Sequence, residues 1–143
     1  MKKILLAVAA LILLTAGGTF GQGLKKGNLV GVHIYSVKLN PGVTIEQFTN
    51  FCINKLFPEW EKNFQGLKLH LGKRIRGLND QTELGLTMIF VFASEKDRDK
   101  YFTAAGETNE LGKALFKKIE PINAELGKLG SLSDDRYTDW LIY

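Results

Sequence analysis

The order in which strand-type and helix-type patterns follow one another limits the folds open to this chain more than any other feature. Four segments are rich in β-branched, aromatic or alternating apolar residues and are predicted as strands: 28–39, 67–76, 83–93 and 137–143. Apolar residues recur at helical spacing between the first and second strands and between the third and fourth. The predicted order is therefore β-α-β-β-α-β.

The first helix has a clear beginning and an interruption. Thr44 is predicted as its N-cap, and Gln47 stands three residues later, as a capping box requires. Pro58 interrupts the apolar stripe, so we expect a kink or a new turn there. The helix is expected to end near Phe64.

The second helical segment is predicted to consist of two parts. Ser94 is expected to cap its start, and the pattern loosens around Gly106. Helical spacing resumes at Leu111, passes Pro121 as an expected kink, and ends at Gly127.

This order predicts an α+β protein with a ferredoxin-like βαββαβ fold, in which right-handed crossovers place both helices on one face of a four-stranded antiparallel sheet. We expect Tyr35, Val37 and Trp140, with one face of the third strand, to form an apolar patch on the opposite face. A patch of this kind is normally covered. The expected cover is a second subunit, which makes the protein a homodimer.

The N-terminus has the pattern of a secretory signal peptide. Lys2 and Lys3 precede the uncharged apolar run Ile4–Leu14, and small residues follow it. We expect residues 1–21 to be removed by cleavage near Gln22, leaving a short linker (22–27) and one domain (28–143). The alternative is an uncleaved membrane anchor, but the apolar run is shorter than the roughly 20 residues of a spanning helix. The protein is therefore predicted to be periplasmic or extracellular, with no membrane attachment after cleavage.

Charge and cysteine content narrow the partners and the chemistry. The net charge of +4 falls by two when Lys2 and Lys3 are removed, so the composition does not indicate a nucleic-acid partner. Cys52 is the only cysteine, which rules out an intrachain disulfide. Its apolar neighbours predict a core position, with a catalytic nucleophile as the alternative.

Several segments together resemble a known superfamily. They are Val37–Thr44 leading into the helix that contains Phe48, the Pro58–Trp60 break, Gly66 before the second strand, and Phe92–Phe102 after the third. In these features the chain resembles the dimeric α/β-barrel proteins, which include antibiotic-biosynthesis-monooxygenase-like, NIPSNAP-like and EthD-like domains, and especially their uncharacterised exported bacterial members. The likeness covers roughly residues 28–143.

The resemblance implies a fold and a homodimer more than an activity. Members of the superfamily include cofactor-free monooxygenases, haem-degrading enzymes, peroxidase-like haem proteins and domains without known activity. No complete catalytic motif of any of these is found in the chain, so no residue role is carried over.

The candidate ligand-binding residues come from the strands. His33 and Tyr35 share one face of the first strand, and His70, Arg74 and Arg76 share one face of the second. We expect His33 and His70 to lie on the same face of the sheet, where they suit an acidic or phenolic ligand. The alternative is that His70, Arg74 and Arg76 are surface residues protecting an edge strand. The full candidate set is His33, Tyr35, His70, Arg74, Arg76 and Trp140.

Other charged residues are assigned mainly structural roles. Asp97 is expected to cap the second helix, and Arg98 to pair with a neighbouring acid. Asp139 is the one carboxylate on a strand that is a candidate for a cleft, with its face undetermined. The two histidines have no carboxylate at ligand spacing, so no metal site and no resident cofactor are predicted.

The leading functional hypothesis is an exported protein that binds a small organic ligand in the cleft between sheet and helices. His33, Tyr35 and His70 would supply its polar groups, with cofactor-free monooxygenase-like or isomerase-like chemistry as the reaction class. The alternative is a non-catalytic structural or interaction domain whose cleft is filled by its own side chains. A third hypothesis is haem binding, which needs only one axial histidine. An open pocket reaching His33 favours ligand binding over the structural alternative.

Overall fold

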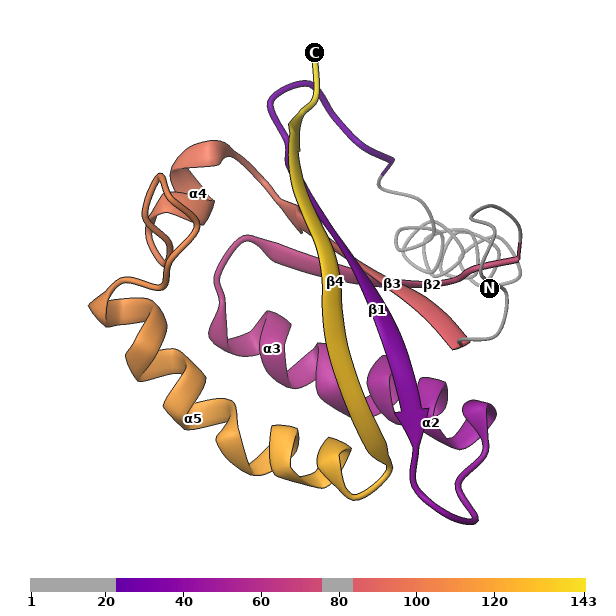
Figure 1. Ribbon diagram of the computed structural model, residues 1–143. Helices are drawn as coiled ribbons and strands as arrows, with labels where there is room; N and C mark the ends of the chain where they lie inside the picture. The colour runs from indigo at the N-terminus through magenta and orange to yellow at the C-terminus, as the bar shows by residue number, and fades with distance from the viewer. Residues whose placement is uncertain (1–22, 76–83) are drawn as a thin grey trace, which may run out of the picture.

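A computed structural model describes residues 23–75 and 84–143, which form one four-stranded antiparallel sheet with helices on one face (Figure 1). The strands are β1 (Leu29–Leu39), β2 (Leu67–Lys73), β3 (Leu84–Phe92) and β4 (Gly130–Leu141). The helical elements are α2 (Ile45–Phe51), the π-helical turn η1 (Cys52–Leu56), α3 (Phe57–Asn63), α4 (Glu95–Asp99) and α5 (Glu110–Gly127). The sheet order β2-β3-β1-β4 confirms the predicted α+β, ferredoxin-like βαββαβ arrangement. The predicted signal peptide, Gln22 and Arg76 lie outside the described residues.

The first helical segment begins as its sequence predicts. The Gln47 backbone N–H donates to Thr44 Oγ1 over 3.2 Å, and the Thr44 N–H donates to Gln47 Oε1 over 2.8 Å, which completes the capping box. The expected interruption at Pro58 takes the form of η1, a wide turn placed just before the proline. A proline has no N–H to donate to the preceding turn, so the backbone there need not keep regular α-helical bonding.

The second helical segment is divided into two helices, as expected. Ser94 Oγ accepts the Asp97 N–H over 3.2 Å at the start of α4. Asn109 Oδ1 accepts the Gly112 N–H over 3.0 Å at the start of α5. Pro121 lies inside α5, which continues to Gly127. Residues 100–109 connect the two helices beside the sheet.

Two strands differ from their predicted bounds. β2 ends at Lys73 instead of Arg76, and Ile75, inside the predicted strand but beyond the observed one, is 84% exposed. β4 begins at Gly130, well before the predicted start at Tyr137. The first half of this edge strand is mostly polar and is held mainly through backbone pairing with β1, with the Leu132 side chain packed against the core.

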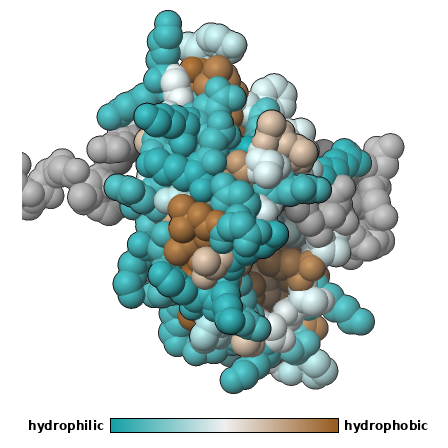
Figure 2. All heavy atoms as spheres, turned by 90° about the vertical axis from the view of Figure 1, so that its left-hand side faces the viewer, coloured by the Kyte–Doolittle hydropathy of each residue, from teal (hydrophilic) through white to brown (hydrophobic). Residues whose placement is uncertain are grey.

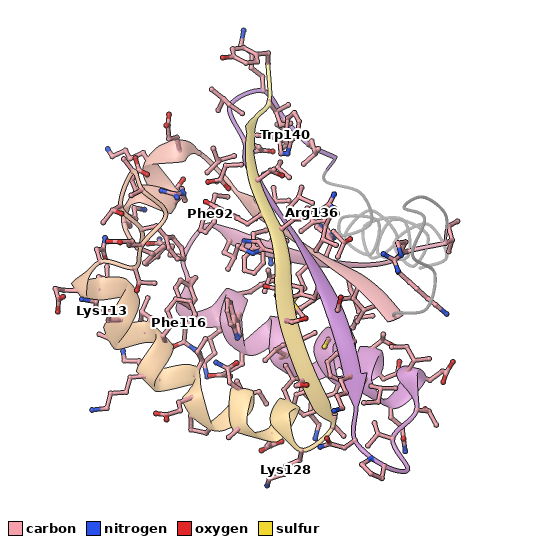
Figure 3. All side chains as sticks on the ribbon, viewed as in Figure 1. Phe92, Lys113, Phe116, Lys128, Arg136 and Trp140 are labelled. Atoms are coloured by element: carbon pink, nitrogen blue, oxygen red, sulfur yellow. The ribbon has the colours of Figure 1, made fainter. Side chains whose placement is uncertain are left out.

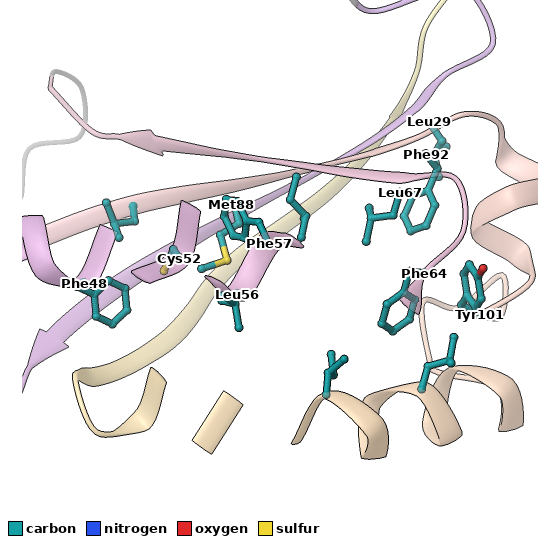
Figure 4. Packing of buried hydrophobic residues seen from close by; sticks show 14 residues of the cluster. Leu29, Phe48, Cys52, Leu56, Phe57, Phe64, Leu67, Met88, Phe92 and Tyr101 are labelled. Carbon is teal, nitrogen blue, oxygen red and sulfur yellow. The ribbon is translucent and has the colours of Figure 1, made fainter. Parts of the chain in front are cut away.

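The core lies between the sheet and the helices (Figure 4). Phe48, Cys52, Leu56 and Phe64 project from the first helical segment and pack against strand residues such as Met88. The larger set of buried apolar residues is Leu29, Phe48, Cys52, Leu56, Phe57, Phe64, Leu67, Leu69, Leu86, Met88, Phe92, Tyr101, Leu115 and Ile119.

Tyr35 and Val37 pack against this core, so the expectation that they lie on the opposite face is wrong. β1 is apolar on both sides, with Val32 and Ile34 alternating with Tyr35 and Val37. Alternation alone therefore identifies two faces of this strand but not which of them meets the helices.

The face away from the helices has an apolar centre and a polar margin. Val30 lies between Val91 and Trp140, and Val32 lies beside Ile89 in the next row. Val30 is buried, whereas Trp140 is 59% exposed. Exposed Lys68, His70 and Arg136 surround this centre.

The outward side of the helices is different in character. Figure 2 views the molecule from the side of α4 and α5, where hydrophobic atoms form separate patches among hydrophilic side chains. Among the helices of residues 23–75 and 84–143, none is both long and apolar enough to cross a bilayer.

Candidate ligand-binding site

A pocket of about 410 Å³ opens between the helix-facing side of the sheet and α3, α4 and α5. Its walls are mainly aromatic: Tyr35, Trp60, Phe90, Phe92, Phe102 and Phe116. Its polar side chains are His33, Arg98, Tyr137 and Asp139, and Gly31 and Gly106 complete the lining. Figure 3 shows Phe92 and Phe116 on the side of β4 that faces α5, whereas Arg136 and Trp140 lie on the other side.

The aromatic walls are fixed by contacts with one another. The Trp60 ring lies edge-on to Phe90 and Phe116, with ring centroids 5.8 Å and 5.3 Å away. The Trp60 Nε1–H donates to Asn123 Oδ1 over 3.2 Å, which ties α3 to α5. Edge-to-face pairs of this kind are favourable beyond the area that they bury, so these rings form the pocket before any ligand arrives.

His33 lies in the wall formed by β1. Its ring centroid is 4.7 Å from those of Phe90 and Tyr137, and it stacks on Tyr35 at 6.0 Å. The pocket reaches His33, as the ligand-binding hypothesis requires.

The polar end of the pocket is a network around Arg98. This buried guanidinium places Nε 3.3 Å from Asp139 Oδ2 and donates from Nη2 to Tyr137 Oη over 3.3 Å. Its Nη1 donates to the Thr103 carbonyl oxygen over 2.7 Å and to Asp99 Oδ1 over 3.3 Å. Tyr137 Oη donates to Asp139 Oδ2 over 2.7 Å. Arg98 thereby holds α4, the α4–α5 connection and β4 together.

The same contacts set the protonation of the network. Burial disfavours the charge of Arg98, but the hydrogen bond to Tyr137 and the Asp139 carboxylate outweigh it and raise the pKa of Arg98. Burial and the hydrogen bond to Asp139 raise the pKa of Tyr137 above its ordinary value, against the opposing effect of Arg98. At neutral pH Arg98 is therefore charged, and Tyr137 is a neutral phenol.

Two glycines leave room for this network. A Cβ on Gly31 would lie 3.0 Å from Asp139 Oδ1. Gly106 has φ +84°, and a Cβ there would lie 3.4 Å from Tyr137 Oη. A side chain at either position would press on the polar end of the pocket, and at Gly106 it would also strain the backbone.

The structure brings together only part of the predicted candidate set. His33 and Tyr35 line the pocket. His70 pairs with Ile89, which pairs with Val32, so it is exposed on the opposite face of the sheet, and the expected grouping with His33 is wrong.

The other candidates are also away from the pocket. Gly85 pairs with Ser36, and both positions belong to the sheet face away from the helices. The Arg74 side chain lies over Gly85 and is therefore on that face. Trp140 lies on the same face, and Arg76 is outside the described residues.

Several pocket residues were not identified from the sequence as ligand-binding candidates. Trp60 and Phe116 have the helical spacing of ordinary core residues, and nothing in a single sequence indicates that the core around them is hollow. Arg98 does pair with acids, as expected, but it also lines the pocket. Asp139, whose face was undetermined, faces the pocket.

Cys52 is a buried core residue, as predicted, and is not a candidate nucleophile. It is fully buried, and this burial raises the pKa of its thiol to about 11, although a backbone hydrogen bond lowers it. At neutral pH the side chain is a protonated thiol, which is a poor nucleophile. Within residues 23–75 and 84–143, no three His, Cys, Asp or Glu side chains gather as metal ligands would.

Comparison with known proteins identifies no family for the chain. No protein-family model matches it, and no curated protein does. One similar solved structure is a de novo designed protein, Foldit4, with 9% identity, coverage of 81% of this chain and 98% of that one, and a TM-score of 0.37. Another is a dimeric protein of unknown function and ferredoxin-like fold from Bacteroides fragilis, with 18% identity, coverage of 79% and 96%, and a TM-score of 0.35. Likenesses this distant say nothing about a ligand or a reaction.

Proposed function

We propose that the protein binds a small aromatic molecule in the pocket between the sheet and helices α3, α4 and α5. The observation that supports this proposal is the pocket itself, an aromatic-walled space of about 410 Å³ that ends at charged and hydrogen-bonding side chains. Ligand sites are typically apolar clefts with a few placed polar groups. The structural alternative requires a filled cleft, and the pocket disfavours it.

The size and walls of the pocket narrow the class of ligand. Its volume lies in the lower part of the roughly 300–1,000 Å³ range of small-molecule sites, which suits a molecule of one or two rings. Flat aromatic ligands can stack on, or lie edge-on to, Trp60, Phe90 and Phe116, which already meet in this way.

The polar groups suit proton transfer better than haem ligation. His33 and Asp139 are both capable of accepting a proton from a bound molecule, which is what cofactor-free monooxygenase-like or isomerase-like chemistry needs. The site fits haem poorly, because His33 is packed among Phe90, Tyr137 and Tyr35 as part of the wall. We therefore propose a ligand site without a resident cofactor.

Tryptophan fluorescence can test the pocket, because the chain has only two tryptophans and they lie on opposite faces of the sheet. In Trp140→Phe, Trp60 is the only tryptophan, and nitrobenzene, a one-ring neutral quencher, is expected to quench it in a saturable manner with an unchanged excited-state lifetime. In the matched variant Trp60→Phe, quenching of Trp140 is expected to be collisional and to rise without saturation. Collisional quenching in both variants would refute the binding site.

The proposed assembly is a homodimer that covers the sheet face opposite the helices. The support is the apolar centre described above, formed by Val30, Val32, Ile89, Val91 and Trp140 within a polar margin. Two copies related by a two-fold axis can bury this self-complementary face in one contact.

The proposed location is outside the cytoplasm. The support is the sequence of residues 1–21, with its basic start, apolar run and small residues. Cleavage near Gln22 leaves the whole described domain intact.

Mass spectrometry of the full chain produced in a bacterial host tests both proposals. The denatured mass is expected to match a chain that begins at or near Gln22, and the native mass to be twice that value. Val32→Asp places a charge at the apolar centre and is expected to give a monomer, whereas Ser131→Asp, at the polar end of β4, should leave the dimer intact. A native mass equal to the denatured mass, or an uncleaved chain, would contradict the respective proposal.

A further inference from the structure

Within residues 23–75 and 84–143, Asp139 offers the pocket one carboxylate oxygen that accepts no hydrogen bond. Its Oδ2 is held by Arg98 Nε at 3.3 Å and by the Tyr137 hydroxyl at 2.7 Å. Its Oδ1 lies over Gly31, 3.0 Å from the point where a Cβ would stand. Gly31 lines the pocket, so the missing side chain leaves Oδ1 open at the pocket floor.

The two donors that contact Asp139, the Tyr137 hydroxyl and the Arg98 guanidinium, are already committed to partners within the protein. The single hydroxyl hydrogen of Tyr137 is directed to Asp139, and all three nitrogens of Arg98 point to Asp139, Tyr137, Thr103 or Asp99. The network therefore presents an acceptor to the pocket. The charge of Arg98 offsets that of Asp139, and the other acid that Arg98 contacts, Asp99, is 53% exposed to solvent, so the acceptor does not require a cationic ligand.

We infer that Asp139 determines the specificity of this pocket by selecting aromatic ligands that carry an O–H or N–H donor, such as phenols and aryl amines. This inference rests on the proposed function, since it names the class of molecule that the same pocket takes. Among the acidic and phenolic ligands expected from the sequence, it favours the phenolic ones. A carboxylate ligand would be repelled by the negatively charged Asp139 oxygen and would find no unpaired guanidinium nitrogen on Arg98.

The energetic reason is the cost of leaving the acceptor without a partner. When an apolar ligand fills an aromatic pocket, it removes water from Oδ1 and offers nothing in return. A donor on the ligand restores a charge-assisted hydrogen bond, which is stronger than a neutral one. Sites built to bond a ligand donor discriminate strongly against the analogue that lacks it.

The test compares 3-nitrophenol with 3-nitroanisole, which differ only in that a methyl group replaces the hydroxyl hydrogen. Both are measured by quenching of Trp60 in the Trp140→Phe protein. We expect the phenol to bind at least about tenfold more tightly, as a hydrogen bond to a charged group predicts.

Two variants remove the free acceptor by different routes. In Asp139→Asn, Arg98 requires the amide oxygen, because a guanidinium only donates, so the amide NH₂ replaces Oδ1 as a donor. In Gly31→Ala, the new methyl group covers Oδ1 while the network keeps its charges. Both variants are expected to reduce the preference for the phenol to less than twofold, with 3-nitroanisole binding retained in Asp139→Asn.

Asp99→Asn is the matched control, because Asp99 also contacts Arg98 but does not line the pocket. Its preference for the phenol is expected to stay as in the parent protein. Equal binding of the two compounds by the parent protein would overturn the inference and leave the pocket standing. Saturable binding of neither compound would instead overturn the proposed function.

Discussion

Replacing Phe64 by alanine is expected to lower the free energy of unfolding by about 3–5 kcal/mol, as is typical of buried phenylalanines. Phe64 is 1% exposed at the end of α3. Its ring lies edge-on to Tyr101 and Phe116, at centroid distances of 5.1 Å and 5.3 Å, and stacks with Trp60 at 5.7 Å. α3, α5 and the connection between α4 and α5 would lose a common partner. The surrounding rings would keep the resulting cavity from collapsing fully.

The measurement is urea unfolding of Phe64→Ala followed by far-ultraviolet circular dichroism. Leu111→Ala is the control, because Leu111 is 51% exposed on α5 and such surface changes are usually within about 0.5 kcal/mol. A loss below about 1.5 kcal/mol for Phe64→Ala would show that the aromatic cluster is not the well-packed core described above.

Replacing Arg98 by leucine is expected to cost about 2–3 kcal/mol, because it leaves Asp139 without its cation and the Thr103 carbonyl without its donor. Removing one partner of a fully buried pair costs about 3–5 kcal/mol. Asp139 is 29% exposed and can recover some hydration, so the expected loss is smaller. Arg98→Lys keeps the charge but not the planar array of donors, and its loss should be intermediate.

Urea unfolding measures these losses, and Lys96→Leu on the same helix is the control, since Lys96 is exposed. A second readout is the ultraviolet titration of tyrosine. Arg98 lowers the pKa of Tyr137 against the larger opposing effects of burial and Asp139, so this pKa should rise further in Arg98→Leu. A protein that keeps its stability and its tyrosine titration after this change would contradict the role given to Arg98.

Most of the fold is predictable from the sequence, because the local signals for helices and strands occur in an order that one common sheet topology accommodates. The capping residues Thr44 and Ser94 mark helix starts correctly, and the βαββαβ order leads to the observed sheet. The start of β4 is not predictable in this way, because residues 130–136 are mostly polar and their strand conformation depends mainly on pairing with β1. The orientation of β1 is also undetermined, because both of its faces are apolar.

The candidate site is predictable only in part. His33 and Tyr35 are two residues apart on one strand, so their common face follows from alternation. Whether His70 joins them depends on which residues of β2 pair with which residues of β3. A shift of this register by one residue moves every β2 side chain to the other face of the sheet, and the sequence does not determine the register. Arg98 and Asp139 are distant in sequence, and only the folded chain brings α4 against β4.

The π-helical turn η1 has a consequence for the phase of the whole first helical segment. Phe48, Cys52, Leu56, Trp60 and Phe64 follow one another at intervals of four residues, and each interval overshoots a regular 3.6-residue turn by about 40°. In an uninterrupted α-helix this stripe would wind away from the sheet. The wider turn takes up part of the overshoot, so one continuous segment directs Phe48 into the core and Trp60 into the pocket. The orientation of a pocket wall is thus set by a stretch of backbone that contributes no side chain to the pocket.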